Sequence, residues 1–350
     1  MTTKGELVVM PEDLESGLTP GRIDVPRDLS SSARVAGFLS ELIPAVGHSD
    51  AAAVLVPWFC DVVKSPHSRR AYGRDLAEFV FQMGELGIHP LHVTGDEIRI
   101  YKEALRRGGL RKSTIARKLS VLRGVFEQFG KRGYIDWETV GDIQSVSSDS
   151  VDKNTTPALS EKEAKAMLHA PNIETVQGLR DYAMLFTYFI TACRASAVAN
   201  AKVSDLERTE TNWYLVVTEK REKTERKSLL EAAEAIHAWL ERSKLVENAP
   251  LFPALERDRV TPTGRHLSSR QVLNLVKKYA RSAGIQVERV GRGVCSHSLR
   301  KTALTNALNH GAKMEQVQAL AGHADIRTTQ LYYENKESDA EDAARHIQIR

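Results

Sequence analysis

A polar segment at residues 145–157 divides the 350-residue chain into two parts, each of ordinary domain length. Its sequence, SVSSDSVDKNTTP, combines serine, threonine and charged residues with a final proline, a composition typical of a linker. Directly after it, Ser160 and Glu163 have the spacing of a capping box, which predicts that a helix begins there. The sequence therefore predicts two domains on either side of this linker, each long enough to bury a core.

The N-terminal part predicts a compact helical domain over residues 36–144. Two apolar series recur at intervals of three and four residues, as on one face of a helix. They are Tyr72, Leu76, Phe79, Met83 and Leu86, and Ile115, Leu119, Leu122, Phe126 and Phe129. Ser113 is placed to cap the second helix, and a shorter helix is expected near residues 96–107. Residues 1–35, with scattered proline and glycine, are expected to form a mobile arm.

The C-terminal part, residues 158–333, predicts a mainly helical domain with a small antiparallel β-sheet. A helix is expected around residues 175–192. The run WYLVVT at residues 213–218 predicts a strand, and residues 227–230 are a plausible partner strand. We expect helices and short loops from there to residue 333. The tail, residues 334–350, is expected to be a short helix or a frayed end.

Positive charge is concentrated in the N-terminal part. The net charge is +4, but residues 61–135 hold fifteen Lys and Arg against eight Asp and Glu, and residues 1–47 hold seven acidic against four basic side chains. Each cation that neutralises a phosphate releases counterions, so a basic module suits a polyanion such as DNA. A solvated helical surface is the common alternative explanation of a charge run.

Two groups of cations lie near the starts of the two long predicted helices, where free N–H groups also favour anions. We expect these residues to contact DNA phosphates, although solvated helix ends would look similar. They are Arg69, Arg70 and Arg74 in one helix, and Arg111, Lys112, Arg117 and Lys118 in the other.

Other protein classes find little support in the sequence. No apolar run approaches the roughly 18 residues that a membrane span needs, so no membrane partner is expected. The N-terminus lacks a signal pattern, and we expect a cytoplasmic protein. The three cysteines, Cys60, Cys193 and Cys295, are far apart and have no metal-ligand spacing. We therefore expect no disulfide framework, no metal and no cofactor.

The residues that best indicate a chemistry lie near the C-terminus. His297 and Arg300 are three positions apart, so at the start of a helix they point the same way. Gly322 is suited to end a helix, which places His323 on the following loop. Tyr332 follows nine positions later. Each residue alone is weak evidence, but their order and spacing agree.

In these residues the chain resembles the tyrosine recombinase family, which includes lambda-type integrases and Xer-type recombinases. The resemblance covers residues 155–335 closely and residues 36–144 more loosely. It implies an earlier arginine, which Arg194 matches in the stretch FITACRASA. It also implies a lysine in the turn of a β-hairpin, here the stretch EKREKTER. Counting from the strand selects Lys220, which we favour, whereas a lambda-like Lys-Thr pair selects Lys223.

These residue types suit the chemistry of a DNA phosphodiester. Its transition state gathers negative charge on the non-bridging oxygens, and two guanidiniums, Arg194 and Arg300, are permanently charged donors for those oxygens. Tyrosine has a reference pKa of about 10, so Tyr332 needs a base or nearby cations to attack phosphorus. Imidazole titrates near neutrality and can accept the phenolic proton.

The resemblance assigns a role to each residue. Tyr332 is the nucleophile that forms a covalent 3′-phosphotyrosine bond, His297 the base, His323 a phosphate ligand and Lys220 the general acid. The resemblance also implies that neither metal nor ATP takes part. Tyr333 is a rival nucleophile, but its spacing from His323 is one residue too long.

Two positions depart from the family pattern. Ala197 stands where relatives carry an acidic residue that braces the active site, and Ala192 stands where they carry glycine. The glycine-rich turn around the lysine is also replaced by charged residues. These departures concern the surroundings of the site, because the five principal residue types are all present.

The resemblance further implies partners and an assembly. It implies a C-shaped clamp on a double-stranded DNA recombination site, a tetramer on two such sites and exchange through a Holliday junction. It allows an accessory protein and docking of the tail on a neighbouring protomer. Integration, cointegrate resolution and chromosome-dimer resolution are not separated. The alternatives are a non-catalytic DNA-binding accessory protein on the same fold, and a telomere resolvase or type IB topoisomerase-like strand transferase.

Overall fold

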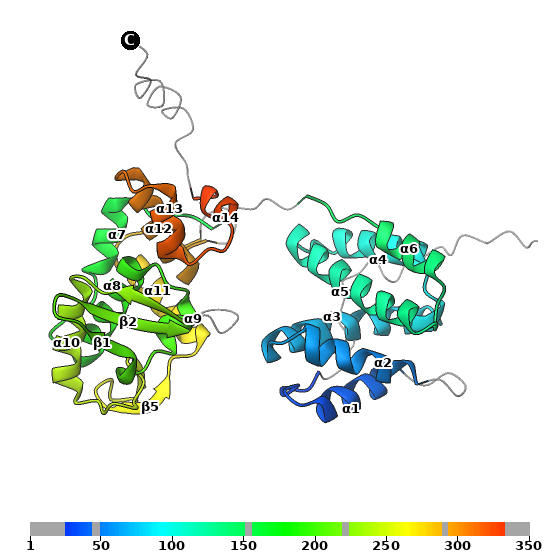
Figure 1. The fold of residues 1–350 in the computed structure, drawn as a ribbon, viewed down its shortest axis with the longest axis horizontal. Helices are drawn as coiled ribbons and strands as arrows, with labels where there is room; N and C mark the ends of the chain where they lie inside the picture. The colour runs from blue at the N-terminus through cyan, green and yellow to red at the C-terminus, as the bar shows by residue number, and fades with distance from the viewer. Residues whose placement is uncertain (1–24, 44–49, 151–155, 219–223, 289–292, 333–350) are drawn as a thin grey trace, which may run out of the picture. The chain divides into compact units, whose positions relative to one another are not determined.

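The computed structural model describes residues 25–43, 50–150, 156–218, 224–288 and 293–332. The chain divides into two compact units, Met1–Val151 and Asp152–Arg350 (Figure 1). The division falls within the polar segment that the sequence analysis identified as a linker. Each unit has its own cluster of buried apolar side chains.

The described part of the first unit is helical. Its elements are α1 (Ser32–Leu42), α2 (Ala51–Pro57), the π-helix η2 (Trp58–Val62), α3 (Pro66–Glu85), the 3-10 helix η3 (Pro90–His92), α4 (Gly95–Arg107), α5 (Lys112–Lys131) and α6 (Trp137–Ser145). The two helices predicted from apolar stripes are α3 and α5, and the shorter one is α4. Phe79 of α3 packs edge to face against Tyr101 of α4 and Phe126 of α5, with ring centroids 5.0 and 6.1 Å apart.

Two predictions for this unit need correction. Arg111, not Ser113, is the N-cap residue of α5, and Ser113 lies inside the helix. The predicted arm is too long, because Leu29 is fully buried in the core and Val35 belongs to α1. The side chain of Arg69 holds this stretch by donating to the carbonyl oxygens of Leu29 and Ser30. Residues 1–24 lie outside the described residues.

The second unit is mainly helical, as the sequence predicted, and it has two small antiparallel sheets where one was expected. Its helices are α7 (Glu161–Leu168), α8 (Val176–Thr191), α9 (Ala195–Ala199), η4 (Val203–Asp205), α10 (Ala232–Ser243), α11 (Ser269–Ser282), α12 (Ser296–Asn309), α13 (Met314–Ala321) and α14 (Ile326–Gln330). Its strands are β1 (Leu206–Arg208), β2 (Trp213–Thr218), β3 (Thr224–Ser228), β4 (Pro253–Leu255) and β5 (Pro262–His266). The predicted capping box of Ser160 and Glu163 begins α7.

The larger sheet has the strand order β1-β2-β3, and the smaller one pairs β4 with β5. In the β2–β3 hairpin Thr218 lies opposite Thr224, so the connection runs over residues 219–223, which lie outside the described residues. The partner strand begins three residues before the predicted position. The β4–β5 pair was not expected, because these strands are short and each begins with proline.

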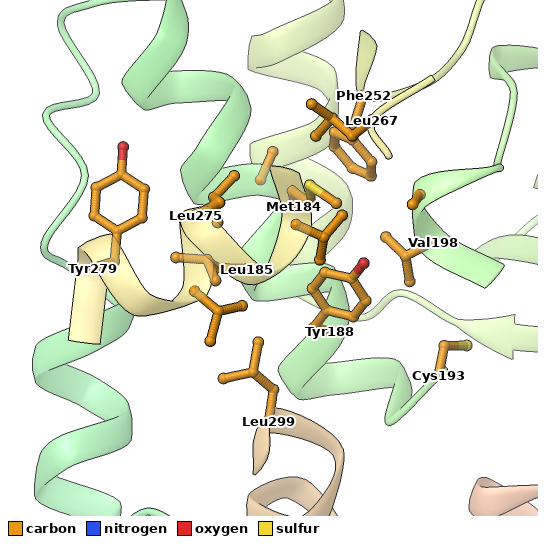
Figure 2. Close-up of a cluster of buried hydrophobic side chains, with 14 of the residues drawn as sticks. Met184, Leu185, Tyr188, Cys193, Val198, Phe252, Leu267, Leu275, Tyr279 and Leu299 are labelled. Atoms are coloured by element: carbon orange, nitrogen blue, oxygen red, sulfur yellow. The ribbon is translucent and has the colours of Figure 1, made fainter. Parts of the chain in front are cut away.

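Helix α8 runs through the core of the second unit (Figure 2). Its residues Met184, Leu185 and Tyr188 pack with Leu275 of α11 and Leu299 of α12 (Figure 2). Burying an apolar side chain of this size stabilises the fold by about 1.5–3 kcal/mol. The two ends of the site described below therefore rest on a common core, because α8 leads into Arg194 and α12 carries Arg300.

Candidate active site

The end of α8 places Arg194. The helix ends at Thr191, and Ala192 has a left-handed conformation with φ of 49°, which turns the chain sharply. Arg194 then becomes the N-cap residue of α9, and the hydroxyl of Tyr188 donates to the carbonyl oxygen of Ala195 at 2.7 Å. The pKa of Arg194 is lowered by burial and then by the charge of Arg300, so this half-buried cation faces a second one.

Arg300 joins three separate stretches of the chain. Its side chain, 2% exposed, donates from Nη1 to the carbonyl oxygen of Ala192 at 2.7 Å and from Nη2 to that of Ala321 at 2.6 Å. The same Nη2 lies 3.0 Å from Nε2 of His323. These contacts fix the plane of the guanidinium and tie the end of α8 to α12 and to the end of α13.

His323 follows the turn that ends α13. Gly322 caps this helix in the left-handed region with φ of 64°, as the sequence predicted. Nδ1 of His323 lies 2.9 Å from the hydroxyl of Thr329. Because a guanidinium only donates, Nε2 accepts from Arg300 and Nδ1 carries the proton. Burial, followed by the charges of Arg300, Arg194, His297 and Lys227, lowers the pKa of His323 to about 4. The ring is therefore neutral near pH 7.

Tyr332 lies against His323 within the same unit. The two rings stack, with centroids 5.7 Å apart and planes 18° from parallel. The tyrosine is 7% exposed and packs with Ala192 and the apolar residues of α12 and α13. The hydroxyl of Thr305 donates to its carbonyl oxygen at 3.2 Å. Figure 1 shows α12, α13 and α14, the helices around this tyrosine, at one end of the unit. Tyr333 lies outside the described residues.

His297 lies in the first turn of α12, one helical turn before Arg300. Its side chain is exposed, and its charge acts on His323. The structure thus brings together Arg194, Arg300, His323 and Tyr332, with His297 at the exposed edge. Lys220 and Lys223 belong to the β2–β3 connection, outside the described residues.

A pair of charged residues on β3 was not predicted from the sequence. Lys227 is 4% exposed and donates from Nζ to the carbonyl oxygen of Leu320 at 2.7 Å. The same atom lies 2.6 Å from Oε2 of Glu225. Alternate residues of a strand point to the same face, and pairing this strand with residues 213–218 would have set Glu225 and Lys227 opposite the apolar Val217 and Leu215. This pairing was obscured because the strand was predicted to begin only at residue 227.

Two of the predicted DNA-contacting cations are buried. Arg69 donates to four backbone carbonyl oxygens: those of Leu29, Ser30, Cys60 and Val63. Lys118 is 3% exposed, and its Nζ lies 2.8 Å from Oε2 of Glu78 and 3.4 Å from Oδ1 of Asp75. Charge count alone cannot distinguish such internal cations from surface ones. The structure therefore removes Arg69 and Lys118 from the predicted DNA-contacting set.

The other cations of that set reach solvent. Arg74, Arg111, Lys112 and Arg117 are exposed, and Arg70 is half-buried. Arg117 also pairs with Asp75. Across the described residues no group of three or more His, Cys, Asp and Glu side chains is placed to hold a metal ion. None of the described helices has the length and apolar character needed to cross a membrane.

Comparison with known proteins agrees with this geometry. Residues 157–339 match the phage integrase family, and residues 61–133 match the phage integrase N-terminal SAM-like domain. The chain is 30% identical over 278 residues to the tyrosine recombinase XerC of Thermodesulfovibrio yellowstonii. This match covers 77% of this chain and 85% of that protein. It is 28% identical over 299 residues to a tyrosine recombinase of Synechococcus elongatus, and this match covers 81% of this chain and 89% of that protein.

The fold is also similar to solved structures. The XerH site-specific recombinase, solved in a post-cleavage complex with a palindromic difH substrate, superposes with a TM-score of 0.64 at 16% identity, covering 89% of this chain and 94% of XerH. The family match spans more than half of the chain and includes Arg194, Arg300, His323 and Tyr332. The chain belongs to the phage integrase family of tyrosine recombinases.

Proposed function

We propose that this protein is a site-specific recombinase that cleaves and rejoins DNA strands through a 3′-phosphotyrosine bond at Tyr332. One observation carries the proposal. The phenol ring stacks on His323, His323 accepts from Arg300, and Tyr332 lies within electrostatic range of Arg194, all within one unit. A tyrosine held among guanidiniums and an imidazole is equipped to attack a phosphodiester.

The guanidiniums would hold the phosphate. Arg194 and Arg300 donate to the non-bridging oxygens, where charge gathers in the transition state. Arg300 is already oriented by two carbonyl oxygens, so little rotamer entropy is lost when the phosphate binds. Because the negative phosphate favours protonation of His323, this imidazole can then donate to the phosphate instead of accepting from Arg300.

Proton transfers complete the step. The oxygen of Tyr332 attacks phosphorus, its proton passes to His297, and the bond from phosphorus to the 5′-oxygen breaks. The leaving 5′-oxygen takes a proton from Lys220, with Lys223 as the alternative donor. The phosphotyrosine ester is close in free energy to the phosphodiester it replaces, so attack by a 5′-hydroxyl reverses the reaction without ATP.

The partner would be a double-stranded DNA recombination site. The exposed cations of the first unit, namely Arg74, Arg111, Lys112 and Arg117, together with Arg70, supply contacts to the DNA backbone. The DNA-bound state of the structurally similar XerH supports this partner. We further propose a tetramer on two sites, exchange through a Holliday junction, and docking of residues 334–350 on a neighbouring protomer. Integration, excision and resolution remain alternative outcomes of the same chemistry.

A nicked suicide substrate tests the proposal. A binding site is first selected from a random-sequence duplex library. A nick on the 3′ side of the cleavage position lets the short fragment that carries the released 5′-hydroxyl diffuse away after attack. Wild-type protein should give a covalent adduct on a denaturing gel, in EDTA and without ATP. Tyr332→Phe should abolish this adduct, and Tyr333→Phe should retain it.

Other results would change the assignment. The opposite pattern of the two tyrosine variants would move the nucleophile by one residue. Wild-type binding without any adduct would favour a non-catalytic DNA-binding protein. With intact substrates, joining of two duplexes, relaxation of one duplex and sealing of ends separate a recombinase from a topoisomerase-like enzyme and a telomere resolvase.

A further inference from the structure

Two charged side chains on β3 lie inside the second unit rather than on its surface. Lys227 is 4% exposed and Glu225 has an 11% exposed side chain, and the two pair at 2.6 Å. Burying an ion pair costs several kcal/mol of desolvation per ion, so such a pair is weak evidence for a gain in stability. The contacts of the pair point to another role.

Both members contact the turn that carries His323. Lys227 donates to the carbonyl oxygen of Leu320 at 2.7 Å, a group near the end of α13. The carboxylate of Glu225 lies against Gly322, where an added Cβ atom would come within 2.6 Å of both of its oxygens. Gly322 therefore has to be glycine for two reasons, its left-handed backbone and the close approach of this carboxylate.

The same pair also acts electrostatically on His323 and Arg194. Lys227 is one of the charges that lower the pKa of His323, and Glu225 is a carboxylate whose charge opposes the lowering of the pKa of Arg194. Ala197, one helical turn after Arg194, offers no charge of its own. A cluster of three cations, Arg194, Arg300 and Lys227, thus has a carboxylate from β3 beside it.

We propose that Glu225 and Lys227 are positioning residues that tie β3 to the turn Leu320–His323 and so set where His323 and Arg300 meet the phosphate. This inference rests on the proposed function, because it assigns the pair to strand cleavage. It also links two parts of the site. Strand β3 begins directly after the segment that holds Lys220 and Lys223, so the tie fixes the base of the hairpin that carries the proposed general acid.

Isosteric variants test the pair. Lys227→Met and Glu225→Gln remove the charges with little change of volume. The Arg226–Glu207 ion pair provides a matched control, because it also links β3 to its sheet but is about half exposed. Its control variants are Arg226→Met and Glu207→Gln. For each variant we would measure DNA affinity, the single-turnover rate of adduct formation on the nicked substrate, and amide hydrogen exchange over residues 318–326.

The expected result separates positioning from binding. Both test variants should slow adduct formation about tenfold or more while DNA affinity stays within about twofold, because misplacement of reacting groups acts on the chemical step. The double variant should be no slower than the slower single variant, since both changes break one tie. Exchange of the His323 amide, which bonds to the carbonyl oxygen of Gln318, should accelerate. The control variants should leave all three quantities unchanged.

Three results would overturn the inference. One is an unchanged rate and unchanged exchange in both test variants. Another is a decrease in DNA affinity without a slower rate of adduct formation, or a slower rate that the control variants share. Either would indicate a general structural role. The third is a normal rate of adduct formation by Lys227→Met on a substrate with sulfur as the 5′ leaving atom. Because a thiolate departs without a proton, this result would mean that Lys227 is the general acid itself. Absence of any wild-type adduct would instead refute the proposed function, and the exchange measurement would still test the tie.

Discussion

Nη2 of Arg300 lies 3.0 Å from Nε2 of His323, and this contact determines the protonation of the imidazole. The guanidinium has only donors, so the ring has to be the neutral tautomer with its proton on Nδ1, towards Thr329. The free pocket therefore combines permanently charged arginines with an uncharged His323. Under the proposed function, a bound phosphate would place its negative charge next to these two guanidiniums.

Replacement of Arg300 by lysine should affect both chemistry and stability. Lysine cannot reach the carbonyl oxygens of Ala192 and Ala321 and the ring of His323 in one geometry. We expect adduct formation to fall by about 100-fold or more, and the free energy of unfolding by about 1–3 kcal/mol. Single-turnover cleavage and urea unfolding measure the two effects. Arg327→Lys, an exposed change on α14, is the control, and equal effects of both variants would contradict the expectation.

The lowered pKa of His323 predicts a dependence of stability on pH. Its folded value of about 4 lies below the ordinary value of 6.5, so between these values the unfolded chain binds more protons. The contribution is therefore fully present above pH 6.5 and is lost as pH falls towards 4. Because the ring is only half-buried, we expect a loss of roughly 1–2 kcal/mol after allowance for solvent screening.

Urea unfolding at several pH values between 7.5 and 4.5 measures this loss. His323→Gln keeps an acceptor for Arg300 but cannot be protonated, so its stability should fall less steeply than that of the wild type. His310→Gln removes an exposed histidine at the end of α12 and should follow the wild-type curve. Parallel curves for wild type and His323→Gln would show that protonation of this ring is not linked to folding.

Gly322 and Gly311 form a matched pair of left-handed glycines. Their φ angles are 64° and 87°, but a Cβ atom at Gly311 meets nothing within 4 Å, whereas one at Gly322 meets Glu225 at 2.6 Å. Gly311→Ala should lower the free energy of unfolding by about 1–2 kcal/mol and leave adduct formation intact. Gly322→Ala should lower the free energy of unfolding by about 1–3 kcal/mol more than Gly311→Ala does, and it should slow adduct formation. Equal effects of the two would mean that the carboxylate moves aside freely.

The cations of the first unit should separate into two classes. Arg111→Gln and Lys112→Gln should each reduce the slope of log affinity against log salt by about one, without loss of stability. Arg69→Met should leave four carbonyl oxygens without their donor and lower the free energy of unfolding by about 2 kcal/mol or more. Fluorescence anisotropy over a salt series, with thermal unfolding, measures both. A reduced slope without destabilisation for Arg69→Met would restore it to the DNA-contacting set.

Much of the fold follows from local patterns in the sequence. The apolar stripes of α3 and α5 repeat every three or four residues, and the run at residues 213–218 forms β2 with the predicted bounds. Gly322 ends α13 because glycine adopts the left-handed conformation of a helix C-cap at little cost. These features depend on neighbours within a few residues, which the sequence displays directly.

Features that depend on distant contacts did not follow. The burial of Lys118 depends on two carboxylates from α3, and the tie from Lys227 to Leu320 spans 93 residues. A helical or strand period contains no information on such pairs. The same holds for Arg69, whose charge suggested a phosphate and whose partners are backbone carbonyl oxygens of the chain itself.

The anchoring of Arg300 makes the geometry of the site depend on the folding of the whole second unit. The guanidinium takes its orientation from carbonyl groups that lie 108 residues before it and 21 residues after it. A partly folded chain therefore has no oriented guanidinium at this position, even when Arg300 and Tyr332 are both present in it. Under the proposed function, the capacity to cleave DNA arises only when the whole unit has folded, and misfolded copies lose it together with their tertiary structure.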